Sequence, residues 1–164
     1  MGYTHYWNFK NRLAPKDIEN GEEKFAKAAG IIKACLKKVT DKGIKIGDGV
    51  GEGEPHITDK SICFNGFGDE SYETFHVALD RDEWDFTKTG RMPYDLLVCL
   101  SLLALKYAFG DDFEYRSDGI TKEDYENRDK NEYWKKIGFV PEGPEPLWQN
   151  AYDVWEEIKA ELNL

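Results

Sequence analysis

The longest apolar run in the sequence, Leu96–Leu105, is interrupted only by Ser101. It is about half as long as the roughly 20 residues that a membrane-crossing helix needs, so we expect it to form a core helix. With its flanking residues this helix covers Pro93–Phe109 and is apolar on nearly every side, which is typical of the helix around which a small domain is built. The other elements of the fold must therefore surround it.

Hydrophobic periodicity predicts two further helices and several short strands around this centre. One helix begins between Pro15 and Gly21 and ends near Gly43, and the other spans Pro146–Leu162. The predicted strands are Tyr3–Asn8, Ser61–Asn65, Thr74–Leu79 and Phe113–Arg116, the middle two forming an antiparallel hairpin. The predicted class is α+β, with an antiparallel sheet of about four or five strands and three main helices, mostly on one face, one of them central and buried.

The length of 164 residues predicts a single globular domain over residues 1–164. Residues 47–56 form a glycine-rich acidic stretch, for which we expect a mobile loop. It lacks the Gly-Lys-Ser/Thr ending of a phosphate-binding loop, and its carboxylates would repel phosphate.

The net charge of −10 is unevenly distributed along the chain. Residues 1–46 carry 10 Lys and Arg against 5 Asp and Glu, whereas residues 47–164 carry 12 against 27. A largely acidic surface repels phosphate backbones, so we expect no general nucleic-acid binding, although a local basic site remains compatible with it.

The sequence also favours an intracellular setting. We see neither a secretory signal nor a membrane span and expect a cytoplasmic protein. The three cysteines, Cys35, Cys63 and Cys99, include no Cys-x-x-Cys pair, which favours buried reduced thiols over disulfides or zinc.

The segment Thr87–Asp95 leads directly into the central helix and is the first candidate site. Free amides at a helix start carry partial positive charge, so Lys88, Thr89 and Arg91 beside them are suited to a phosphate, sulfate or carboxylate. The alternative is structural: Arg91 pairs with Asp95 or Asp85, Lys88 is solvated and Thr89 is only a turn residue.

The N-terminal strand is the second candidate, because Tyr3, His5, Tyr6 and Trp7 offer flat rings and polar tips that suit a stacked base. Alternation places Tyr3, His5 and Trp7 on one face and Tyr6 on the other. The alternative is that these rings simply pack beneath a helix.

Recognised catalytic signatures are missing from the sequence, which favours binding over turnover, and no catalytic residue is assigned. We expect neither a cofactor nor a metal. The acidic run Asp80, Asp82, Glu83 and Asp85 has no recognisable ligand spacing and is better explained as a solvated turn.

Four segments in order resemble a family of small, largely uncharacterised bacteriophage and prophage proteins: Met1–Trp7, Ile62–Gly66 with Tyr72–Phe75, Lys88–Asp95, and Ser117–Gly119. The resemblance covers most of residues 1–119. It implies a viral accessory protein in the host cytoplasm and supplies no catalytic residue. Its segments add Asn65, Ser117 and Asp118 to the candidate ligand-binding residues.

Together these features favour a phage accessory protein that binds a small anionic, nucleotide-like ligand and sequesters a host defence signal. Two alternatives stay open: a hydrolase or phosphodiesterase whose residues meet only in the fold, and an acidic nucleic-acid mimic that inhibits a host defence protein. The sequence leaves homo-oligomer formation open.

Overall fold

The computed structural model describes residues 2–82 and 84–164. Met1 of the opening motif and Glu83 of the acidic run lie outside the described residues. The helices are α1 (Gly21–Asp41), α2 (Asp95–Phe109), α3 (Lys122–Glu126), α4 (Glu132–Ile137) and α5 (Pro146–Leu162). The strands are β1 (Thr4–Phe9), β2 (Ile46–Gly47), β3 (His56–Ile57), β4 (Ser61–Gly66), β5 (Phe75–Ala78), β6 (Asp85–Lys88) and β7 (Phe113–Ser117).

The predicted α+β class is confirmed, but the strands divide between two antiparallel sheets. One sheet has the order β6-β1-β7; in the other, β4 pairs with β2, β3 and β5. The predicted hairpin is present as β4 and β5, with Ser61 opposite Ala78. The expected single sheet of four or five strands is replaced by sheets of three and four strands, because β1 pairs only with β6 and β7.

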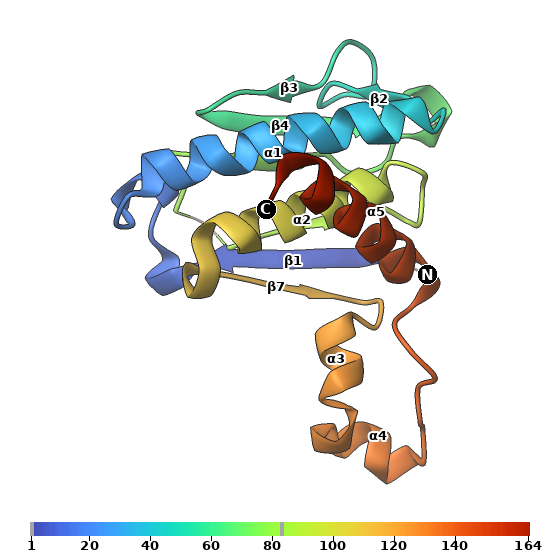
Figure 1. The fold of residues 1–164 in the computed structure, drawn as a ribbon. Coiled ribbons are helices and arrows are strands. Elements are labelled where there is room, and N and C mark those ends of the chain that lie inside the picture. Colours follow the sequence, from blue (N-terminus) through green and yellow to red (C-terminus); the bar gives the residue numbers. More distant parts are fainter. Residues whose placement is uncertain (1, 83) are drawn as a thin grey trace.

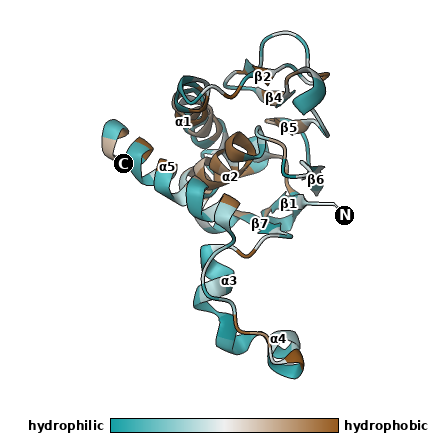
Figure 2. Ribbon diagram, turned by 90° about the vertical axis from the view of Figure 1, so that its right-hand side faces the viewer, coloured by the Kyte–Doolittle hydropathy of each residue, from teal (hydrophilic) through white to brown (hydrophobic). Residues whose placement is uncertain are grey.

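Helix α2 lies at the centre of the molecule, as its all-round hydrophobicity predicts. It contacts α1, α5 and β7, and Leu97 and Leu100 are fully buried. Figure 2 shows α1, α2 and α5 together on one side of the strands. The outer face of the β6-β1-β7 sheet is therefore not covered by any of these three helices. No helix in the described part of the chain is long and apolar enough to cross a membrane.

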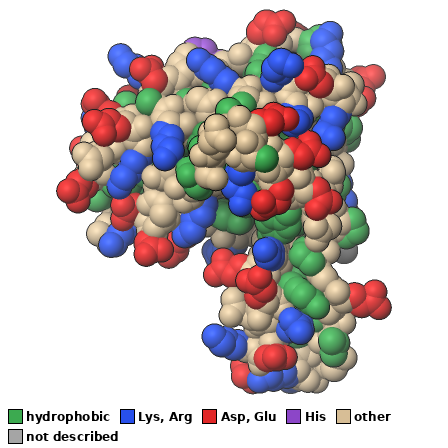
Figure 3. All heavy atoms as spheres, in the orientation of Figure 1, with side chains coloured by type: hydrophobic (Ala, Val, Ile, Leu, Met, Phe, Trp, Pro, Cys, Tyr) green, Lys and Arg blue, Asp and Glu red, His purple; other side chains and the backbone are tan. Residues whose placement is uncertain are grey.

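The segment that carries α3 and α4 projects from the body as an arm (Figure 1). Its two ends meet where the Glu145 amide donates to the Ile120 carbonyl at 2.8 Å. Figure 3 shows the helical face of the molecule, where acidic and basic side chains are interspersed rather than gathered in one patch.

The glycine-rich loop is organised around Asp48. The backbone amides of Glu52, Val50 and Gly53 donate to its carboxylate at 3.0–3.1 Å. These bonds, led by that of Glu52, lower the pKa of Asp48 below its ordinary value. The mobility expected for this loop stays a prediction.

Candidate functional site

The first amides of α2 already have backbone partners. The backbone amides of residues 95–97 each donate to the carbonyl three residues earlier, at 2.9–3.3 Å. Before them, residues 89–92 form a tight turn in which Gly90 and Arg91 have φ values of 58° and 61°. These amides are therefore already used within the turn and the first helical turn, and the anion site at this helix start stays a prediction.

Asp95 is the partner of Thr89, not of Arg91. The carboxylate is 1% exposed, and its Oδ1 accepts from the Thr89 hydroxyl at 2.5 Å and lies 2.7 Å from His5 Nε2. The Cys99 thiol donates to Oδ2 at 3.4 Å. Thr89 is 0% exposed, so its hydroxyl holds the buried Asp95 carboxylate and does not face the surface.

Arg91 belongs to a different network at the edge of the molecule. Its Nε lies 3.5 Å from Glu145 Oε1, and its guanidinium lies 4.3 Å from the centre of the Tyr3 ring. The Tyr3 hydroxyl donates to the other oxygen of Glu145 at 3.0 Å, and that oxygen also caps α5 by accepting from the Leu147 amide. Burial, aided by nearby negative groups, raises the pKa of Tyr3. Arg91 and Tyr3 therefore secure the base of the arm, and the proposed pairing of Arg91 with Asp95 or Asp85 is not what the structure shows.

The structure places the predicted stacking residues on opposite faces of β1. Tyr3, His5 and Trp7 share a face, as alternation predicts, but that face is turned into the core and they are 0%, 0% and 3% exposed. Trp7 packs against Phe75 with ring centres 4.9 Å apart. These three side chains cannot stack on a ligand, because the helices cover them.

A cysteine, a histidine and an aspartate meet at the start of α2, but they do not form an accessible catalytic centre. Cys99 and His5 are fully buried, with Cys99 Sγ 3.8 Å from His5 Nε2. Burial raises the pKa of the Cys99 thiol well above its usual value, and the Asp95 carboxylate adds to this shift. A thiol that is both buried and protonated is a poor nucleophile for an external substrate.

Asn65, Ser117 and Asp118 have structural partners. The Asn65 side chain accepts from the Tyr72 amide at 2.9 Å and donates to the Tyr72 carbonyl at 3.0 Å, so it fixes the loop after β4. The Ser117 hydroxyl accepts from Trp148 Nε1 at 2.9 Å.

Asp118 follows β7 and stands at the edge of the small sheet. Its carboxylate accepts from the Thr4 amide at 3.0 Å. It also accepts a long hydrogen bond of 3.5 Å from the hydroxyl of Tyr6, so it borders the outer face of β1.

The outer face of the β6-β1-β7 sheet carries an exposed aromatic cluster. Trp84 and Phe86 are 42% and 45% exposed, and Tyr6 is half-buried between neighbouring strands. The Tyr6 ring is stacked with Trp84 at 6.0 Å and lies 6.4 Å from Phe86, while Trp84 and Phe86 are 5.5 Å apart. We call Tyr6, Trp84 and Phe86 the aromatic face.

Two cations flank the aromatic face. Arg116 is directly opposite Tyr6 in the register of β1 and β7, with its guanidinium 6.0 Å from the ring centre. Lys88 lies two residues beyond Phe86 and therefore on the same side of β6. Neither cation forms an ion pair within residues 2–82 and 84–164. Other surface cations do have acidic partners: Lys38, for example, contacts two glutamates.

Sequence reasoning found Tyr6 and Lys88 but missed Trp84, Phe86 and Arg116. The detectable signal was the alternation of Trp84, Phe86 and Lys88 with Asp85 and Thr87, which places two aromatic side chains and a cation on one face of a strand.

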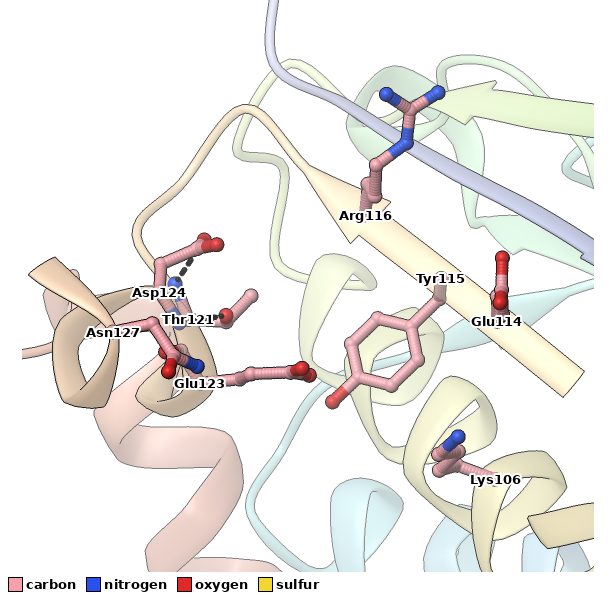
Figure 4. Close-up of a pocket in the computed structure, with 8 residues that line it drawn as sticks. All are labelled: Lys106, Glu114, Tyr115, Arg116, Thr121, Glu123, Asp124 and Asn127. Atoms are coloured by element: carbon pink, nitrogen blue, oxygen red, sulfur yellow. Dashed lines mark hydrogen bonds between the residues drawn. The ribbon is translucent and has the colours of Figure 1, made fainter. Parts of the chain in front are cut away.

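A cavity of about 360 Å³ lies between β7 and the arm (Figure 4). Lys106 and Tyr115 line one side, and Glu123 and Asp124 of α3 line the other. In this view the Arg116 side chain points away from α3. With carboxylates on its wall and Lys106 already donating to the Phe113 carbonyl at 3.0 Å, this cavity suits an anion less well than the aromatic face does.

No protein-family model matches this chain, and comparison with curated proteins and with solved structures finds no match either.

Proposed function

We propose that this chain binds a small anionic, nucleotide-like ligand on its aromatic face. The observation that supports this most is the grouping of Tyr6, Trp84 and Phe86, partly exposed, beside the cations Arg116 and Lys88, which form no ion pair within the described chain. A nucleobase stacks on such rings, and its phosphate is attracted to the cations beside them.

Stacking on a ligand would explain why aromatic side chains are grouped on this surface. Large apolar side chains on a surface are individually common, but grouped ones mark interaction sites more often than scattered ones. Base stacking on an aromatic side chain contributes about 1–3 kcal/mol and tolerates different bases, because every base has a π-face.

Charge limits the size of the ligand. The chain carries a net charge of −10, and Arg116 stands between Glu114 in β7 and Asp118 just after the strand. A long phosphate backbone would meet these carboxylates, whereas a mononucleotide or short nucleotide presents its few charges only to Arg116 and Lys88. The proposal therefore concerns a small nucleotide and not a polymeric nucleic acid.

The resemblance to bacteriophage proteins suggests a biological role for this binding. We propose that the protein acts as a viral accessory factor in the host cytoplasm and sequesters a host nucleotide signal of defence. Binding without turnover suits this role, since the Cys99, His5 and Asp95 side chains are out of reach of a ligand on the aromatic face.

Calorimetric titration with the four common nucleoside 5′-monophosphates tests the proposal. The variants Trp84→Ala and Tyr6→Ala each remove a stacking ring and should weaken binding by about 1–3 kcal/mol. Tyr133→Ala is the matched control, because Tyr133 is 67% exposed but lies on the arm. It should leave affinity unchanged.

A second comparison separates base recognition from phosphate recognition. Arg116→Ala should weaken binding of adenosine monophosphate by about 1.5–3 kcal/mol and leave binding of adenosine unchanged, because only the nucleotide carries the charge that the guanidinium meets. The proposal fails if none of the four monophosphates binds or if Tyr133→Ala weakens binding as much as Trp84→Ala. Recovery of a cleaved nucleotide after incubation would favour the hydrolase alternative.

A further inference from the structure

A second feature lies beneath the opposite face of β1. His5 from β1 and Asp95 and Cys99 from α2 converge inside the protein, and their side chains are fully or almost fully buried. Asp95 and Cys99 are four residues apart and therefore share one side of the helix, directed at the strand. Among residues 2–82 and 84–164, these three form the only group of three or more His, Cys, Asp or Glu side chains whose potential ligand atoms all lie within 4.8 Å of one another.

The distances between these atoms approach those around a tetrahedral metal ion. Zinc bonds of about 2.3 Å to sulfur and about 2.0–2.2 Å to nitrogen and oxygen place neighbouring ligand atoms about 3.3–3.6 Å apart. Cys99 Sγ lies 3.4 Å from Asp95 Oδ2 and 3.8 Å from His5 Nε2. His5 Nε2 lies 2.7 Å from the other carboxylate oxygen, Asp95 Oδ1, and this distance would lengthen by about 0.6 Å if Oδ1 bound the ion.

The buried negative charge of Asp95 also favours a bound cation. The Asp95 carboxylate is 1% exposed and receives hydrogen bonds from Thr89, Cys99 and His5, but it has no Lys or Arg partner in the described chain. A buried charge without a permanently charged cationic partner is costly. A divalent ion with one carboxylate, one thiolate and one neutral imidazole gives a ligand set with no net charge.

We propose that His5, Asp95 and Cys99 bind a zinc ion that joins β1 to α2. A thiolate, an imidazole and a carboxylate are the ligands that zinc uses in proteins, whereas magnesium and calcium select oxygen alone. The fourth ligand of the tetrahedral ion would be a water molecule or the Thr89 hydroxyl, which lies beside Asp95 Oδ1. Because His5 precedes Tyr6, the ion would fix the strand that carries the aromatic face.

Cobalt substitution of the 164-residue chain tests this assignment. Apoprotein prepared with a chelator is titrated with Co²⁺, and we expect one equivalent to bind with the visible bands of tetrahedral cobalt and a thiolate-to-cobalt charge-transfer band. Zinc should displace the cobalt and raise the thermal midpoint. Cys99→Ala should abolish the charge-transfer band and the thermal shift.

Matched variants separate this cluster from other thiols and histidines. Cys35 is also fully buried but lies in α1, so Cys35→Ala should retain the band. His56, Cys63 and His76 form a row across β3, β4 and β5 and are the alternative thiol-containing group that the test must exclude. The double variant Cys35→Ala/Cys63→Ala should retain the band in full, which assigns it to Cys99 even if Cys99→Ala does not fold.

Three results would overturn the proposal. The first is a wild-type apoprotein that shows neither one-to-one cobalt binding nor a zinc-dependent thermal shift, which would leave the cluster as a hydrogen-bonded network only. The second is loss of the band in Cys63→Ala, which would place the metal on the surface row. The third is a folded Cys99→Ala protein that retains the band.

Discussion

Replacing Thr89 by Val tests whether the start of α2 is a structural centre or a ligand site. Val keeps the shape of Thr but removes the hydroxyl that donates to Asp95 Oδ1 at 2.5 Å. Hydrogen bonds to charged groups contribute about 1.5–3 kcal/mol, so the free energy of unfolding should fall by that amount. For a chain of this length each kcal/mol lowers the melting midpoint by about 2–4 °C, which predicts a decrease of about 3–12 °C.

Thr87→Val supplies the control, because Thr87 is equally buried but its hydroxyl donates to the neutral Thr74 carbonyl at 3.1 Å. That bond should contribute only about 0.5–1.5 kcal/mol. Urea and thermal unfolding of both variants, without any ligand, should rank Thr89→Val as the more damaging. If Thr89→Val costs no more than Thr87→Val, then Asp95 is not the charged acceptor that the structure indicates.

The remaining predictions concern other parts of the chain. Arg91→Ala should cost less than about 1 kcal/mol and show no coupling to Asp95→Asn in a double-mutant cycle, because Arg91 forms a half-exposed ion pair elsewhere; coupling above about 0.5 kcal/mol would contradict this. Leu100→Ala should cost about 2–5 kcal/mol in urea unfolding, since Leu100 is fully buried in the central helix. The lowered pKa of Asp48, caused first by the Glu52 amide, predicts a loop that is fully stabilised above the ordinary Asp pKa of about 3.9 and loosens as pH falls through the lower native value. Amide exchange measured against pH checks this, and Asp48→Ala should remove the dependence.

The sequence predicted those parts of the fold that depend on local patterns. The three long helices follow from apolar periodicity, and the β4–β5 hairpin follows from two short strand patterns separated by a glycine-containing turn. Division into two sheets could not be predicted, because β1 finds its partners about 80 and 110 residues away, and alternation does not identify a strand's partner.

Local patterns also predicted the candidate site only in part. Alternation correctly grouped Tyr3, His5 and Trp7 on one face of β1, but both faces carry aromatic residues, so the pattern alone does not say which one the helices cover. Tertiary packing on α2 turned that group inward and left Tyr6 outside. Arg91 appeared available from its position before the helix, but its partner Glu145 is 54 residues away in the sequence.

The most direct measurement is a proton–nitrogen NMR titration of the labelled 164-residue chain with adenosine monophosphate, because it locates the binding surface. We expect the largest shifts in the backbone amides of Tyr6, Trp84, Phe86 and Arg116, and little change in the arm or α1. Shifts centred on the start of α2 or on the cavity beside the arm would contradict it, as would no shifts at millimolar nucleotide.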